Sequence, residues 1–181
     1  MSKLYTRKDS RLSGYDYSNS GAYYVTVCSL NRKCIFGDIN CVGGRLALPR
    51  IKLSKIGEII NCHWEDMPEQ YDNVKLDEYV IMPNHIHGIL FINKRDGASP
   101  SPTYLGGIIG AFKSRCTVDY LKYIRGNKLD TSAKIWQRNY HDHIIRNGRS
   151  LGKIREYIRN NPLNWDNDVE NPNRIDNIKI K

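Results

Sequence analysis

The sequence lacks several patterns that assign proteins to common classes. Its five cysteines are an odd number, and none lies in a C-x-x-C pair. This distribution fits neither a disulfide framework nor a zinc-finger spacing, and it suits a reducing compartment. No stretch approaches the roughly 20 apolar residues that span a bilayer, and the polar first 20 residues contain no apolar core of a secretory signal. We therefore expect a cytoplasmic protein with no membrane partner.

One nucleotide-binding signature and one RNA-binding signature are also missing. The chain has no G-x-x-x-x-G-K-[ST] loop, so we expect no nucleotide cofactor. It also lacks the [KR]-G-[FY]-[GA]-F-V-x-[FY] segment that is typical of RRM domains. No internal repeat is visible, which argues against a solenoid.

The composition is that of a basic, folded protein. The chain has 181 residues, of which 40% are hydrophobic and 10% aromatic, enough for one domain with a real core. Lysine and arginine number 28 against 19 acidic residues, which gives a net charge of +9. This excess favours a polyanionic partner, and nucleic acid is the commonest one. A basic protein without such a partner has the same composition.

The spacing of apolar residues predicts alternating strands and helices. Ser54 and Ser150 are expected to cap two helices, Pro68 and Pro162 to end them, and Gly43-Gly44 to form a hairpin turn. Strands are predicted over residues 21–30, 73–82, 85–93 and 135–147, and helices over residues 53–68, 106–126 and 150–162.

This order predicts an α+β fold of the ferredoxin-like (split βαβ, RRM-like) type. Helices would cover one face of an antiparallel sheet, a C-terminal helix would carry a tyrosine, and the other face would be free to hold nucleic acid. We expect residues 1–20 to form a flexible basic arm, residues 21–165 the catalytic domain, and residues 166–181 a polar tail.

Two histidines interrupt the most hydrophobic part of the chain, VIMPNHIHGILFI. Side chains two apart on a strand point to the same face, so His85 and His87 project together. Two neutral imidazoles side by side can provide two ligands of a metal site. Alternatively, one histidine is buried in the core with its hydrogen bonds made, and the other is exposed.

The predicted helix over residues 150–162 offers a second set of polar groups. Tyr157 lies at the edge of its apolar stripe, and Asn161 follows four residues later on the same side. Arg155 and Arg159, also four apart, form an adjacent basic face. A phenol, an amide and two guanidiniums beside a two-histidine metal site would form a phosphodiester-cleaving centre. Alternatively, Tyr157 is a half-buried structural tyrosine.

Three segments together resemble a known family. VIMPNHIHGIL is similar to the HUH motif (His, hydrophobic, His), and WQRNYHDHIIRN followed by EYIRNNP resembles a segment of the REP-associated tyrosine transposases. Their broader relatives are the insertion-sequence-200-like single-tyrosine transposases. The resemblance runs from about residue 23 to residue 162. It implies that His85 and His87 bind a metal ion, that Asn161 is a third ligand, and that Tyr157 is the nucleophile.

The resemblance implies a metal-dependent single-stranded DNA transposase or nuclease. Such an enzyme cleaves and rejoins DNA through a 5′-phosphotyrosine intermediate, with Mg²⁺ or Mn²⁺ as cofactor and single-stranded or hairpin DNA of repetitive palindromic type as partner. It would act as a monomer or a homodimer. The expected DNA-binding residues are Arg155, Arg159, Lys113, Arg115, Arg7 and Lys8.

Other interpretations of the same residues remain open. The chain could be a non-catalytic, RRM-like nucleic-acid-binding module that uses its sheet as a stacking platform. It could also be a metallohydrolase in which His141 or His143 joins the histidine pair. Tyr140 is a second candidate nucleophile, although its place in an alternating segment predicts that it packs against the core.

Overall fold

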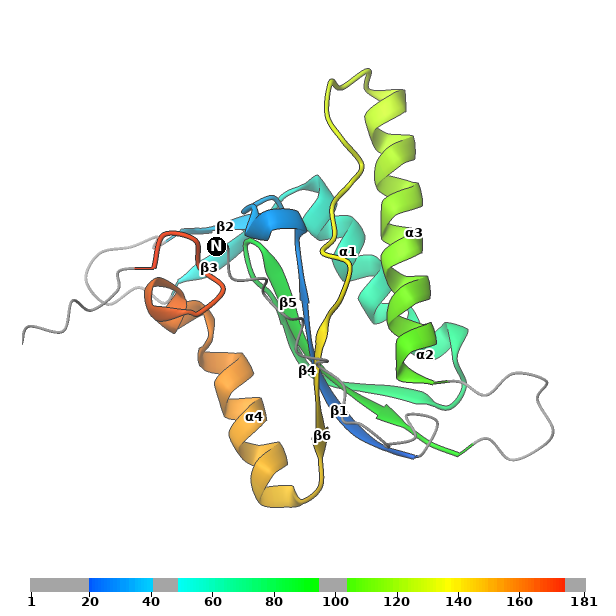
Figure 1. Ribbon diagram of the computed structural model, residues 1–181, viewed down its shortest axis with the longest axis vertical. Helices are drawn as coiled ribbons and strands as arrows, with labels where there is room; N and C mark the ends of the chain where they lie inside the picture. The colour runs from blue at the N-terminus through cyan, green and yellow to red at the C-terminus, as the bar shows by residue number, and fades with distance from the viewer. Residues whose placement is uncertain (1–19, 41–48, 95–103, 175–181) are drawn as a thin grey trace, which may run out of the picture.

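A four-stranded antiparallel sheet organises the chain (Figure 1). The computed structural model describes residues 20–40, 49–94 and 104–174. The strand order is β4-β5-β1-β6, with β1 paired antiparallel to both β5 and β6. This is the strand order of a ferredoxin-like sheet, so the predicted fold class is confirmed. The strands are β1 (Gly21–Cys28), β4 (Val74–Ile81), β5 (His85–Ile92) and β6 (His141–Ile145).

Helices α1 (Lys55–Glu65) and α3 (Leu105–Gly126) cover one face of this sheet (Figure 1). The largest cluster of buried apolar side chains lies between them and the sheet, and Trp64 is fully buried in it. Gly88 of β5 makes room for this indole, because a Cβ atom there would lie 2.2 Å from the Trp64 ring. The alternate residues of β5 therefore have to point away from α1 and α3.

The ends of α1 follow the sequence prediction in part. The Ser54 hydroxyl oxygen accepts a hydrogen bond from the Gly57 N–H, which confirms the predicted cap. The helix ends at Glu65, before the expected stop. Pro68 instead lies in the first turn of α2 (Met67–Gln70), where a missing N–H and a fixed φ are well tolerated.

A second, two-stranded sheet consists of β2 (Gly37–Asn40) and β3 (Arg50–Leu53), paired antiparallel. The predicted turn at Gly43-Gly44 lies outside the described residues. The predicted strand over residues 135–147 is reduced to β6, with a separate bridge between Ser29 and Trp136. The described cysteines Cys28, Cys34, Cys62 and Cys116 are all unpaired.

Helix α4 (Gly148–Asn160) lies on the other face of the sheet (Figure 1). Its apolar stripe, which includes Leu151, Ile154 and Ile158, packs with Ile89 of β5. Its N-cap is Asn147, whose side-chain oxygen accepts from the Ser150 N–H, so the predicted Ser150 cap is wrong. Asn is among the strongest N-cap residues, which explains the earlier start of the helix.

The sheet face beneath α4 is not free, contrary to the expectation. Besides α4, the 3₁₀ helices η1 (Leu30–Arg32) and η3 (Pro162–Asn167) complete the described elements. The Trp165 ring of η3 lies beside the His85 ring of β5, with ring centroids 6.1 Å apart and the two planes tilted by 34°. The segment after α4 thus folds back onto the end of the sheet. Within the described ranges, no helix has the length and apolar character needed to cross a membrane.

Candidate metal centre and its tyrosine

Strand β5 presents both histidines to the α4 side of the sheet. Ile86 and Leu90 belong to the core cluster on the opposite face, so the period-two alternation places His85 and His87 together, as predicted. Their ring centroids lie 4.3 Å apart, and both side chains are buried. Two adjacent imidazoles in the interior need polar partners, and the chain supplies a different set to each ring.

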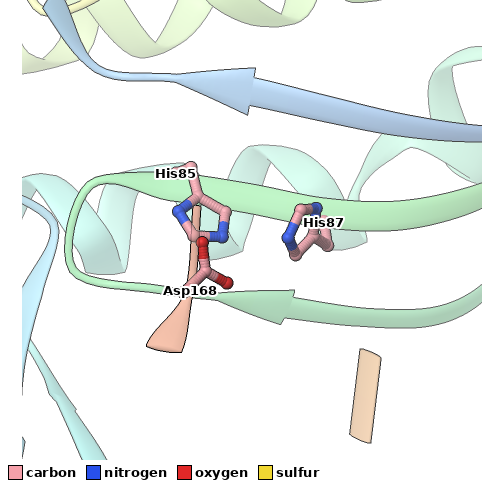
Figure 2. A group of neighbouring side chains, drawn as sticks. All are labelled: His85, His87 and Asp168. Carbon is pink, nitrogen blue, oxygen red and sulfur yellow. The ribbon is translucent and has the colours of Figure 1, made fainter. Parts of the chain in front are cut away.

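Asp168 completes a group of three candidate ligands. The ligand atoms of His85, His87 and Asp168 all lie within 4.8 Å of one another, and Figure 2 shows the carboxylate facing the two imidazoles. Asp168 is buried in the segment that the sequence analysis set apart as a polar tail. Its carboxylate is held by the Asn161 amide nitrogen at 2.8 Å and by the Glu170 N–H at 2.6 Å.

The donor set fits a divalent ion. The Nε2 atom of His85 is buried and has no hydrogen-bond partner within the described part of the chain, so its lone pair is available to bind a metal ion. Two imidazole nitrogens and one carboxylate oxygen suit Mn²⁺ and later transition metals better than Mg²⁺, which prefers oxygen ligands. The residues present could therefore hold a divalent metal ion, which the sequence analysis expected.

Two hydroxyl groups of β1 hold the second imidazole. The Nδ1 atom of His87 lies 2.7 Å from the Tyr24 hydroxyl and 2.9 Å from the Thr26 hydroxyl. Because Thr26 pairs with His87 across the two strands, its side chain points to the same face. Because these two hydroxyl groups hold Nδ1, the opposite ring nitrogen, Nε2, faces the tyrosine of α4.

Both imidazoles are neutral at neutral pH. Burial lowers the pKa of His85 to about 3, and the nearby Arg32 guanidinium adds to the effect. Burial, followed by the neighbouring His85, holds the pKa of His87 well below its usual value. A neutral imidazole is the form that binds a metal ion, so no proton has to be displaced near pH 7.

The Tyr157 hydroxyl lies 3.5 Å from the Nε2 atom of His87. Helix α4 carries this tyrosine at the edge of its apolar stripe, and 45% of the residue is exposed. Burial of the phenol raises its pKa above the ordinary value, the Asp168 carboxylate raises it further, and the Asn161 amide lowers it. A cation beside Asp168 would offset the effect of that carboxylate and favour the phenolate.

Three other residues predicted for the site come from α4 and from the residue that follows it, Asn161. Asn161 is buried beside Asp168, with its Oδ1 atom unpartnered in the described structure, so its role as a metal ligand stays a prediction. Arg155 and Arg159 form ion pairs with Asp77 and Glu78, both at 2.6 Å. Their expected contact with DNA stays a prediction.

The other residues predicted to contact DNA lie in earlier parts of the chain. Lys113 donates hydrogen bonds to the carbonyl oxygens of Gln137 and Arg138, which ties α3 to the segment before β6. Arg115 is half-buried on α3, whereas Arg7 and Lys8 lie outside the described residues. Tyr140 packs against the main core, as predicted. His141 and His143 of β6 are exposed on the site's face of the sheet, as their pairing with Thr26 and Tyr24 requires.

Sequence reasoning missed Asp168, Tyr24 and Thr26. The only signal for the β1 pair is its period-two spacing, which places Tyr24 and Thr26 on one face without saying which strand they adjoin. Asp168 has no local signal, because it follows Pro162 in an irregular segment whose path depends on tertiary contacts.

Comparisons with known proteins support both the fold and a family assignment. No family model matches the chain. An uncharacterized protein of Haemophilus influenzae is 34% identical over 180 residues, an alignment that covers 91% of this chain and 93% of that protein. The solved structure of a REP-associated tyrosine transposase bound to a REP hairpin has a TM-score of 0.54 at 16% identity, over 85% of this chain and 74% of the other. The chain therefore belongs to the same family as the Haemophilus influenzae protein, and its fold is that of the REP-associated tyrosine transposase.

Proposed function

We propose that this protein is a single-tyrosine HUH transposase or nuclease, which cleaves and rejoins single-stranded DNA through a 5′-phosphotyrosine intermediate. One observation carries the proposal: the Tyr157 hydroxyl lies 3.5 Å from the Nε2 atom of His87, beside a cluster of two histidines and one aspartate. The shared fold with a REP-associated tyrosine transposase supports it. The HUH-like segment on β5 precedes the tyrosine helix α4 along the chain, as in the resemblance.

His85, His87 and Asp168 would hold the divalent ion, either Mg²⁺ or Mn²⁺. When bound, the ion would act as a Lewis acid that draws charge from a non-bridging phosphate oxygen. The two buried imidazoles keep their lone pairs for this purpose because both are neutral. Asn161, whose amide nitrogen donates to Asp168, orients the carboxylate or joins it as a ligand.

Tyr157 supplies the nucleophile. Its phenolic oxygen attacks the phosphorus atom of a phosphodiester, the new bond from Oη to phosphorus forms, and the bond from phosphorus to the 3′-oxygen breaks. The phenolic proton passes to water, and the released 3′-oxygen takes up a proton from water, so that no net proton is gained or lost. The covalent bond conserves the energy of the phosphodiester, so that the reverse step rejoins the strand without a nucleotide cofactor.

Single-stranded or hairpin DNA is the proposed partner. The related solved transposase is bound to a REP hairpin, and the net charge of +9 favours a polyanion. Helix α4 packs on the sheet of its own chain, so one protomer brings Tyr157 to the metal ligands. The proposed active unit is accordingly a monomer, with a homodimer as the alternative, and we expect it in the cytoplasm.

Two rival functions fit the geometry less well. An RRM-like binding module needs an open sheet face for stacking bases, and here α4 and Trp165 lie on that face. A metallohydrolase built with His141 or His143 needs one of these side chains among the ligands. Within the described ranges, the cluster that could hold a metal contains Asp168 instead.

A labelling experiment tests the proposal. The protein is incubated with 5′- and 3′-labelled single-stranded hairpin DNA, with and without Mn²⁺, and then denatured. A label on the 3′ side of the cut should stay attached to the protein only when the ion is present. Tyr157→Phe should bind the DNA and give no adduct, and Tyr140→Phe should give a normal one. An undiminished adduct in Tyr157→Phe would exclude the proposed nucleophile.

A further inference from the structure

A buried asparagine that the proposed mechanism does not use lies immediately before the first histidine. Asn84 belongs to the connection between β4 and β5, and its side chain has no exposed surface. A buried amide has two N–H donors and one carbonyl acceptor to satisfy. Every one of these groups has a partner at a normal hydrogen-bond distance.

The partners of the amide nitrogen fix the orientation of the side chain. Its Nδ2 donates to the carbonyl oxygen of Arg32 at 3.0 Å and to that of Glu170 at 2.7 Å. Carbonyl oxygens accept hydrogen bonds and cannot donate them, so Nδ2 and not Oδ1 must face both. The Arg32 carbonyl comes from a turn in which Asn31 and Arg32 both have a φ of 55°, a left-handed conformation that is uncommon for arginine.

The orientation of the amide in turn fixes the tautomer of His85. The Oδ1 atom of Asn84 lies 2.8 Å from the Nδ1 atom of His85. Because Oδ1 can only accept, the imidazole must carry its proton on Nδ1. A neutral imidazole has a single N–H, so Nε2 is left with a bare lone pair. This is the buried atom that has no hydrogen-bond partner in the described part of the chain.

The same amide also supports the third candidate ligand. The Glu170 carbonyl that accepts from Asn84 belongs to the residue whose N–H donates to the Asp168 carboxylate at 2.6 Å. Asn84 therefore contacts both sides of the site, namely the β5 histidine and the turn that presents Asp168. Asn84 thus links His85 and Asp168, two candidate ligands that are 83 residues apart in the sequence (168 − 85).

We propose that Asn84 is a positioning residue of the metal centre, whose Oδ1 holds His85 in the Nδ1–H tautomer while its Nδ2 anchors the turn that carries Asp168. The inference rests on the proposed metal-dependent function, because Asn84 acts through two ligands and does not touch the ion. Without Asn84, the His85 proton can move to Nε2 and the Asp168 turn loses an anchor. Loss of such an outer partner typically weakens metal binding by about 10-fold to 100-fold.

The tautomer can be read directly from the metal-free protein. Long-range ¹H–¹⁵N correlation spectra distinguish a protonated nitrogen of each imidazole from a bare one. The His85 ring of the wild type should show a protonated Nδ1 and a bare Nε2. In Asn84→Asp the carboxylate still accepts from Nδ1–H, so the tautomer should persist, whereas Asn84→Ala should lose it.

Metal affinity gives the second measurement. Titration of Mn²⁺, followed by electron paramagnetic resonance of the free ion, should show binding about 10-fold to 100-fold weaker in Asn84→Ala than in the wild type. Asn73→Ala is a matched control, because Asn73 is also buried and also donates to a backbone carbonyl, that of Asn93, near the opposite end of β5. It should bind Mn²⁺ like the wild type even if it lowers stability.

The outcomes separate this inference from the proposed function. A wild-type His85 protonated on Nε2 would overturn the role of Asn84, whether or not any variant folds. Unchanged Mn²⁺ affinity in a folded Asn84→Ala would overturn it as well. Absence of Mn²⁺ binding by the wild type, with the expected tautomer present, would instead contradict the metal-dependent function.

Discussion

A bulge in β4 is predicted to set the position of the tyrosine helix. The pairing of β4 with β5 slips between Leu76 and Tyr79, so that Asp77 and Glu78, which neighbour each other in the strand, both reach α4. In a regular strand, consecutive side chains would point to opposite faces. The two carboxylates instead pair with Arg155 and Arg159, one helical turn apart and on either side of Tyr157 in the sequence.

The ion pair between Arg155 and Asp77 is expected to contribute more to stability than the pair between Arg159 and Glu78. Arg155 Nε lies 2.9 Å from one carboxylate oxygen and 3.2 Å from the other, and a terminal guanidinium nitrogen lies 2.6 Å from the nearer one. Only 15% of the Asp77 side chain and 39% of the Arg155 side chain are exposed. Exposed pairs contribute about 0.2–1 kcal/mol, and breaking a fully buried one costs about 3–5 kcal/mol. For this half-buried, two-point pair we expect about 1–2 kcal/mol from Arg155→Ala.

A double-mutant cycle measures this contribution. The free energies of unfolding in urea are compared for the wild type, Asp77→Ala, Arg155→Ala and the double variant, with tryptophan fluorescence as the signal. Arg149→Ala is the control, because Arg149 is an exposed arginine of the same helix. We expect a coupling energy of about 1 kcal/mol between Asp77 and Arg155. A coupling energy near zero, or equal losses in Arg155→Ala and Arg149→Ala, would refute the reasoning.

Three further changes test the packing and electrostatics of the site. Burial lowers the pKa of His85 to about 3, so the unfolded chain binds more protons than the folded one between about pH 3 and 6.5. Metal-free protein should therefore lose about 1.4 kcal/mol of stability per pH unit from this residue as the pH falls. His85→Gln should reduce the slope of the unfolding free energy against pH, measured by urea denaturation at a series of pH values. Gly88→Ala should destabilise the protein by about 1–3 kcal/mol, because the added Cβ would lie 2.2 Å from a buried indole; an unchanged thermal midpoint would contradict this packing. Asn147→Ala should lower stability by about 1 kcal/mol through loss of the α4 cap, whereas Ser150→Ala should have little effect, and the reverse order in circular-dichroism melts would restore Ser150 as the cap.

Local patterns were sufficient for the parts of the site that depend on periodicity. The alternation along β5 places His85 and His87 on one face, and the helical spacing in α4 places Tyr157 at the edge of its apolar stripe. The order of strands and helices, with these periods, was enough to predict the ferredoxin-like sheet. These features follow from the backbone geometry of single elements and from how such elements pack.

Tertiary contacts decided the rest. Asp168 reaches the histidines because η3 turns the chain back after Pro162 and the turn is anchored by Asn84, a contact between residues 84 and 170. No repeat or spacing in the sequence encodes that path. The Asn147 cap was missed because Ser150 also satisfies the capping pattern, and the covered sheet face was missed because helical periodicity does not reveal the face on which α4 docks.

The identity of the residue joined to DNA tests the central claim most directly. The adduct formed with Mn²⁺ and single-stranded hairpin DNA is digested with nuclease to leave a single nucleotide, then with trypsin, and analysed by mass spectrometry. The account predicts the added mass on the peptide from Glu156 to Arg159, which contains Tyr157 as its only hydroxyl-bearing residue. A nucleotide found on a peptide that contains Tyr24 or Tyr140, with none on Tyr157, would contradict it.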